Sequence, residues 1–109
     1  MEESEYRQKI EAALNRIEKA LRDVDPDLAE CENTMGSLTI LFSDRTRCIL
    51  SAQPSLQQLW LALAAEGTAY HFNFDPGSAN WRDDKGGKVE LISFLETYLS
   101  RKTGLALKL

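Results

Sequence analysis

The spacing of apolar residues changes twice along this chain of 109 residues, and these changes limit the folds it can adopt. Residues 4–23 place apolar side chains every three or four positions, the pattern of a helix with one buried face. Ser4 is the predicted N-cap, and Pro26 is expected to end the helix because proline supplies no amide hydrogen. Residues 89–101 return to helical spacing, and Gly104 is expected to end this second helix.

Between the two predicted helices, the apolar residues alternate with polar ones, as in strands with one buried face. Turn residues separate the alternating segments, which are 28–34, 36–43, 47–52, 57–64, 69–74 and a short edge strand at Trp81. Two helices with one apolar stripe each can cover one face of such a sheet. The sequence therefore predicts an α+β fold, a two-layer sandwich in which an antiparallel sheet of five to six strands carries both helices on one face. Residues 1–109 are expected to form a single domain.

Acidic residues are concentrated near the N-terminus. The chain has a net charge of −4, and residues 1–32 hold ten acidic and five basic side chains, against seven and eight in residues 33–109. No basic stripe is available to displace counterions from phosphates, which argues against nucleic acid and favours cations or a basic protein surface as partners. No apolar run approaches the roughly 20 residues of a membrane span, and the acidic N-terminus is unlike a targeting signal, so we expect a cytoplasmic protein.

Nothing in the sequence indicates an active site, and the chain is not expected to be an enzyme. His71 is the only histidine, and no serine or cysteine nucleophile is placed to pair with it. Cys31 and Cys48 are 17 residues apart and are expected to be small, buried or half-buried thiols in strands. The run DDKGGK lacks the spacing and the Lys/Ser pair of a phosphate-binding loop.

A run of carboxylates lies where the first helix gives way to the first strand. If the first strand is an edge strand, these side chains form a ridge, which we call the acidic ridge: Glu18, Asp23, Asp25, Asp27, Glu30 and Glu32. Oxygen ligands suit hard cations, and the lack of histidine favours several weak, exposed positions over one closed site. The alternative is a solvated face whose acids protect an edge strand from aggregation. Anions at a helix C-terminus oppose the helix dipole, which favours a functional use of these acids.

The exposed face of the sheet offers a second candidate site. If Leu59 and Leu61 point inward, Trp60 points outward, on the same side as His71 and Asn73. A large aromatic side chain among amides and an imidazole is a common anchor for a protein partner. A position beneath a loop would explain Trp60 equally well.

These residues together resemble the frataxin family, in its short bacterial form. The strings SLQQLWLA and AYHFNF are similar to the family's glutamine, tryptophan and Tyr-His-Phe signature. GSLTILF after ECEN resembles its first hairpin, and SEYRQKIEAALNRIEKALRD resembles its first helix with acids at its end. The similarity covers nearly the whole chain in the same order. It implies the frataxin fold, with both helices on one side of the sheet.

The resemblance also implies a function. Family members are non-enzymatic accessory proteins of iron–sulfur cluster assembly that bind Fe²⁺ and Fe³⁺ weakly on an acidic ridge and dock on the cysteine desulfurase and scaffold proteins. The matching ridge is the acidic ridge named above, and the matching partner site comprises Gln58, Trp60, His71 and Asn73. A monomer that forms iron-dependent oligomers is expected.

The sequence departs from the family pattern in three places. Lys19 and Arg22 stand where bacterial ridges usually carry acids, which neutralises part of the iron surface. The run RDDKGG replaces the usual residues after Trp81, and AAEG before TAYHF is slightly long. A metal-independent protein-interaction module, with the acidic ridge serving solubility and edge protection, is therefore the alternative hypothesis.

Overall fold

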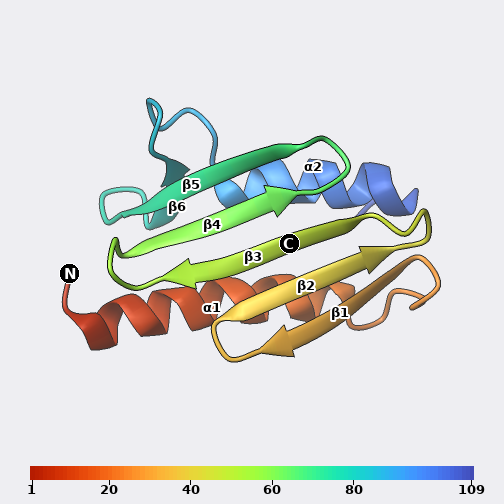
Figure 1. Cartoon of the computed structure of the whole chain (residues 1–109), viewed down its shortest axis with the longest axis horizontal. Helices are drawn as coiled ribbons and strands as arrows, with labels where there is room; N and C mark the ends of the chain where they lie inside the picture. The colour runs from red at the N-terminus through yellow and green to blue at the C-terminus, as the bar shows by residue number, and fades with distance from the viewer.

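The computed structural model describes all residues, 1–109. The chain runs from one helix through six strands to a second helix (Figure 1). The elements are α1 (Glu3–Leu21), β1 (Ala29–Thr34), β2 (Ser37–Phe42), β3 (Arg47–Gln53), β4 (Gln58–Leu63), β5 (Thr68–Asp75), β6 (Asn80–Asp83) and α2 (Leu91–Thr103).

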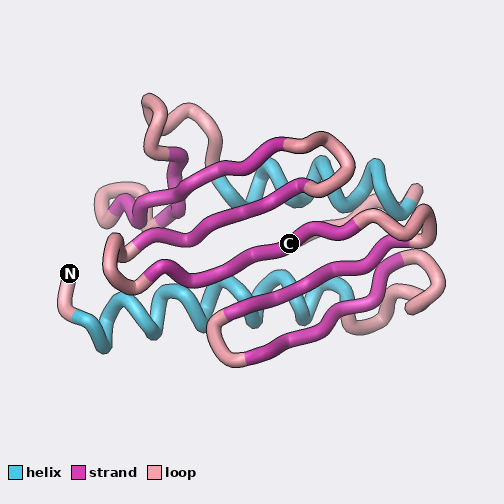
Figure 2. Tube along the Cα trace, viewed as in Figure 1, coloured by secondary structure: helices cyan, strands magenta, loops and turns pink.

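The six strands form one antiparallel meander in the order β1-β2-β3-β4-β5-β6. Short turns join consecutive strands, and both helices lie on the same side of the sheet (Figures 1 and 2). The predicted α+β sandwich is confirmed. The strands β1 and β6 are the sheet edges, so the acidic first strand meets the condition set for the acidic ridge.

Alternation along each strand separates a buried face from a solvent face. On β4, Leu59, Leu61 and Leu63 are buried, whereas Trp60 is half-buried on the opposite face and Ala62 is exposed. The buried face packs against the apolar stripes of α1 and α2, and together they form one core of 21 buried residues. The outer face carries no helix, and it is the surface on which Trp60 lies.

The buried hydroxyl of Tyr6 joins α1 to the sheet. It donates a hydrogen bond of 2.6 Å to the carbonyl of Gln58 and accepts one of 3.0 Å from the amide of Gln53. Gln53 and Gln58 are the last pair of the β3–β4 ladder. Tyr6 therefore supplies hydrogen bonds to two backbone groups at the end of this ladder, next to the turn. Burial raises the pKa of Tyr6 above its usual value, against the lowering effect of the bond from Gln53.

The C-terminal tail connects the two helices. The amide of Leu109 donates to Glu96 Oε2 of α2 at 3.0 Å, and Arg16 Nε of α1 donates to the Leu109 carbonyl at 3.0 Å. Leu107 and Leu109 are half-buried against the core. The tail therefore closes the helical layer from outside.

The predicted ends of the first helix were partly wrong. The N-cap is Glu2, not Ser4, and its side chain makes no capping bond. The helix ends at Leu21, before Pro26, because the chain turns there: the amide of Val24 bonds to the carbonyl of Leu21 at 3.1 Å. Val24 packs against the core from this turn. The end of α2 was predicted correctly, since Gly104 adopts φ 75° directly after Thr103.

An ion pair fixes the end of α2 to the turn between β2 and β3. Lys102 Nζ lies 2.6 Å from Asp44 Oδ2, bonds to Thr46 Oγ1 at 2.9 Å, and lies 5.1 Å from the centre of the Phe42 ring. The bond from Lys102, with those from Thr46, holds the pKa of the Asp44 carboxyl well below its usual range. A lowered pKa in the folded state stabilises that state above the unfolded pKa of about 4, and the stabilisation disappears as the pH falls through the lower folded value.

We therefore expect Asp44→Asn to lower the free energy of unfolding at neutral pH, with the difference from the parent protein shrinking below about pH 4. Urea unfolding measured at several pH values checks this. The control is Glu11→Gln, which removes an exposed carboxylate and should cause no such pH-dependent difference. A difference for Asp44→Asn that stays constant down to about pH 2 would show that the pair with Lys102 does not stabilise the fold.

Candidate functional site

The outer face of the sheet brings together all four residues predicted to bind a partner. Trp60 on β4 lies opposite His71 on β5, and Gln58 lies opposite Asn73. The rings of Trp60 and His71 stack, with their centroids 4.2 Å apart and their planes 14° from parallel. Trp60 and His71 are each half-buried on this face.

Hydrogen bonds link these side chains into a cluster. The indole N–H of Trp60 donates to Gln58 Oε1 at 2.9 Å, and Gln58 Nε2 donates to Asn73 Oδ1 at 3.2 Å. These bonds hold the amide of Gln58 in one orientation, and they fix the indole against the sheet. The cluster is therefore preorganised, and part of the ordering cost of binding is already met.

Asp84 is a member of this cluster that sequence reasoning missed. Its Oδ2 lies 3.7 Å from His71 Nδ1 and accepts a bond of 3.4 Å from Gln58 Nε2. Asp84 follows β6, and its amide bonds to the carbonyl of His71 at 2.8 Å. The register of β5 against β6 would have placed Asp84 beside His71. The run RDDKGG has no alternation of apolar and polar residues, so the sequence does not predict that register. We call Gln58, Trp60, His71, Asn73 and Asp84 the Trp60 cluster.

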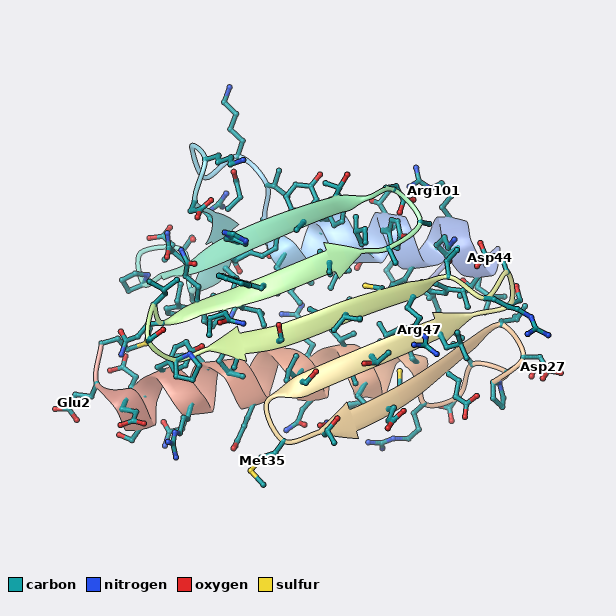
Figure 3. The ribbon with its side chains drawn as sticks, viewed as in Figure 1. Glu2, Asp27, Met35, Asp44, Arg47 and Arg101 are labelled. Atoms are coloured by element: carbon teal, nitrogen blue, oxygen red, sulfur yellow. The ribbon has the colours of Figure 1, made fainter.

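The acidic ridge lies around the β1 edge of the sheet. Glu30 and Glu32 point to the outer face, opposite Leu41 and Thr39 of β2. Asp23, Asp25 and Asp27 are exposed in the connection between α1 and β1, and Figure 3 shows Asp27 beyond the strand ends. Asp25 is also structural, since its Oδ1 accepts the amide of Asp27 at 2.9 Å.

Glu18 occupies the other side of β1 from Glu30 and Glu32. Its carboxylate accepts a long bond of 3.5 Å from Asn33, and its charge adds to the effect of burial in raising the pKa of the nearby Cys31 thiol. Glu18 and Glu30 both line a shallow groove at this edge, together with Arg22. The ridge therefore wraps around the edge strand instead of lying on one flat face.

Basic side chains lie beside the ridge. Arg47 of β3 lines one groove with Glu30 and Glu32 on the outer face, where Figure 3 shows it above the strands. None of the six ridge carboxylates forms an ion pair within 4.0 Å. No three histidine, cysteine, aspartate or glutamate side chains converge closely enough to hold a metal ion together. The donors present are single, exposed carboxylates, which fit a loosely held and hydrated hard cation but not a closed metal centre.

The two thiols are placed as predicted. Cys31 is half-buried and Cys48 is buried, and both are free. Burial, with a smaller contribution from the Glu18 charge, raises the pKa of Cys31 to about 11. Burial and the Glu66 charge raise the pKa of Cys48 to about 12. Both side chains are protonated at neutral pH and are poor nucleophiles and metal ligands.

Known proteins are similar to this chain in sequence. A model of the frataxin-like domain matches residues 1–105. The chain is 39% identical to the iron-sulfur cluster assembly protein CyaY of Paraburkholderia phytofirmans, over 95% of this chain and 93% of that protein. It is 34% identical to the CyaY of Tolumonas auensis, over 95% and 94%.

Solved structures resemble the fold. A frataxin from Psychromonas ingrahamii matches with a TM-score of 0.85 and 24% identity, over 99% of this chain and 97% of that one. A trimeric frataxin from the yeast Saccharomyces cerevisiae, complexed with ferrous iron, matches with a TM-score of 0.65 and 22% identity, over 95% and 88%. No helix here is long and apolar enough to cross a membrane. From its sequence and its six-stranded sandwich, this chain belongs to the frataxin-like family.

Proposed function

We propose that the chain is a non-enzymatic accessory protein of iron–sulfur cluster assembly, which docks through the Trp60 cluster on a cysteine desulfurase and its scaffold protein. The observation that carries the proposal is the stacked, hydrogen-bonded Trp60 on an uncovered sheet face. Its relatives are named for iron–sulfur cluster assembly, which supports the pathway. A tryptophan that is held in position and half-exposed supplies the large apolar contact typical of binding hot spots.

Glu30 and Glu32 of the acidic ridge share one continuous outer surface with the Trp60 cluster. Glu32, Thr39, Ile49 and Ala62 follow one another across four strands, and Ala62 is two residues from Trp60. Three strand spacings place β4 about 14 Å from β1. A basic partner surface attracted to the acidic edge would therefore arrive beside Trp60, and this attraction should weaken with added salt.

Iron is proposed as cargo on the acidic ridge. Exposed carboxylates that do not converge suit weak binding of Fe²⁺ or Fe³⁺ at several positions, and they do not suit a single tight site. The same lack of convergence, with Arg22 and Arg47 close by, favours the second candidate function: a metal-independent interaction module whose acids protect the β1 edge.

Anaerobic titration of the ¹⁵N-labelled protein with Fe²⁺ separates the two candidates. Iron binding predicts that amide signals of residues 23–32 broaden first, while signals of α2 stay sharp. Glu30→Gln with Glu32→Gln should reduce the broadening. The control is the double variant Glu2→Gln with Glu5→Gln, which removes the same amount of charge from exposed positions at the far end of α1. It should leave the broadening of residues 23–32 unchanged. No selective broadening of residues 23–32 in the parent protein would favour the metal-independent module.

A further inference from the structure

The edge of β5 is only half covered. The strand β6 pairs with Phe72–Asp75 and leaves the first half of β5 without a neighbour on that side. The ladder ends where the amide of Asp84 bonds to the carbonyl of His71. Alternate residues of an antiparallel strand direct their backbone groups to the same side, so the N–H and C=O of Ala69 point toward the uncovered edge. Ala69 is exposed, and such an edge is a template for another strand.

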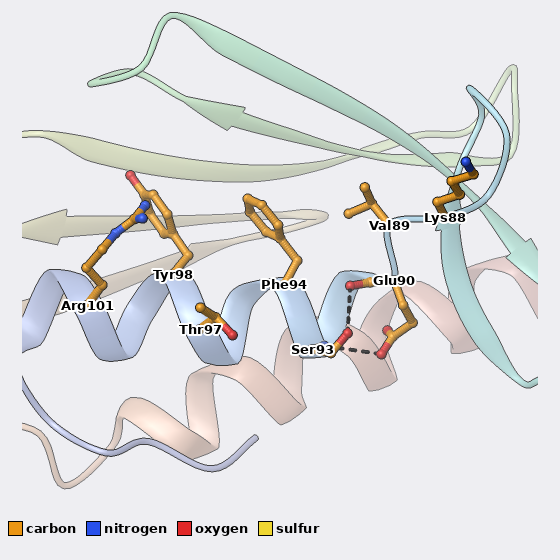
Figure 4. A pocket seen from close by; sticks show the side chains of 8 residues that line it. All are labelled: Lys88, Val89, Glu90, Ser93, Phe94, Thr97, Tyr98 and Arg101. Atoms are coloured by element: carbon orange, nitrogen blue, oxygen red, sulfur yellow. Dashed lines mark hydrogen bonds between the residues drawn. The ribbon is translucent and has the colours of Figure 1, made fainter.

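A groove of about 410 Å³ lies along α2 beside this edge (Figure 4). Its floor is apolar, formed by Val89, Phe94 and Tyr98. The ring of Phe94 lies 5.1 Å from that of Tyr70, the residue after Ala69 on β5. The groove thus adjoins the uncovered half of the strand.

Two basic side chains lie at opposite ends of the groove. Figure 4 shows Lys88 at one end and Arg101 at the other, with the apolar floor between them. Neither cation forms an ion pair within 4.0 Å; the Arg101 guanidinium lies 5.5 Å from the centre of the Tyr98 ring.

The nearby acids already have partners. Glu90 accepts bonds from the amides of Ile92 at 2.6 Å and Ser93 at 3.1 Å, which caps α2. Glu66 accepts the Tyr98 hydroxyl at 3.0 Å. Both carboxylates keep their negative charge, but their oxygens already accept bonds from the protein, so Lys88 and Arg101 are the charged groups of the groove that are free to bond a ligand.

We propose that this groove binds an extended acidic segment of a partner protein, which adds to the free edge at Ala69 as a short strand. Its backbone would pair with Ala69, an apolar side chain would lie on Phe94, and carboxylates would meet Lys88 and Arg101. The helix from Leu91 to Arg101 is about 15 Å long, which about five strand residues span. The expected segment is thus five residues long, with an acidic residue at each end and an apolar residue in the middle.

This surface is separate from the Trp60 cluster, and the proposal does not depend on iron or on cluster assembly. It gives the chain a second contact, on the sheet edge opposite the acidic ridge. Two contacts on one partner would raise the overall affinity through effective concentration.

The test is an NMR titration of the full ¹⁵N-labelled chain with the peptide Glu-Thr-Leu-Thr-Glu, blocked at both ends, and with Lys-Thr-Leu-Thr-Lys as its control. The acidic peptide should shift the amide signal of Ala69 and slow its hydrogen exchange, and leave the Trp60 indole signal unchanged. Lys88→Glu with Arg101→Glu should weaken its binding on the order of tenfold and improve binding of the basic peptide.

A backbone variant tests the strand addition itself. Ala69→Pro removes the free N–H at a position where an edge strand tolerates proline, and it should abolish the effect of the acidic peptide. Circular dichroism confirms that the variant is folded. Equal binding by Ala69→Pro, equal binding of both peptides, or no shift at this edge would overturn the proposal. So would concentration-dependent self-association through Ala69 in sedimentation experiments without peptide binding, because the occupant would then be a second copy of the chain.

Discussion

Under the proposed docking through the Trp60 cluster, replacing Trp60 with alanine is expected to weaken binding to a cysteine desulfurase by about 30-fold to about 1,000-fold, or about 2–4 kcal/mol. The change removes the largest side chain on the outer face and the ring that stacks 4.2 Å from His71. It also leaves Gln58 Oε1 without its 2.9 Å bond from the indole, so the amide loses its fixed orientation. Isothermal titration calorimetry with purified desulfurase measures the loss.

Two controls make this experiment specific. Ala62→Ser changes an exposed residue on the same strand and face and should bind as the parent does. Fe²⁺-induced broadening of residues 23–32 should be the same in Trp60→Ala and the parent, because the ridge is three strands away. Desulfurase binding by Trp60→Ala within twofold of the parent would remove Trp60 from the docking site.

Leu61→Ala is expected to lower the free energy of unfolding by about 2–5 kcal/mol. Leu61 is fully buried in the middle of β4, between Leu50 of β3 and Tyr70 of β5. Close-packed neighbours from two strands relax little, so most of the deleted volume remains as a cavity. Urea unfolding followed by far-UV circular dichroism gives the value.

The neighbouring position provides the matched control. Ala62→Ser lies one residue along on the solvent face and should change stability by less than about 0.5 kcal/mol. The pair tests whether alternation along β4 assigns the two faces correctly. Similar losses in both variants would contradict that assignment, and with it the outward position of Trp60.

The fold followed from the sequence because its two periodicities are local. A spacing of three or four residues identified α1 and α2, and a spacing of two identified the strands, including which side of β4 holds Leu59 and which holds Trp60. The ends of α1 were harder, because the turn after Leu21 is set by the packing of Val24 against the core. That contact is a property of the tertiary structure and leaves no periodic signal.

The candidate sites were predictable only as far as strand pairing could be guessed. Alternation alone placed Trp60, His71 and Asn73 on one face, but the contacts of Asp84 depend on the register between β5 and β6. The position of Arg47 beside Glu30 likewise depends on two consecutive registers, β1 with β2 and β2 with β3. Charge counts along the sequence could not show that this arginine meets the acids.

The most direct measurement of docking is an NMR titration of the ¹⁵N-labelled chain with unlabelled cysteine desulfurase. If docking occurs through the outer face, the Trp60 indole signal and the amide signals of Gln58, His71 and Asn73 should shift or broaden at substoichiometric amounts of the desulfurase. The amide signals of α2 should respond only to the slower tumbling of the complex. Signal changes confined to the helical layer, with the Trp60 indole signal unchanged, would contradict docking through the outer face.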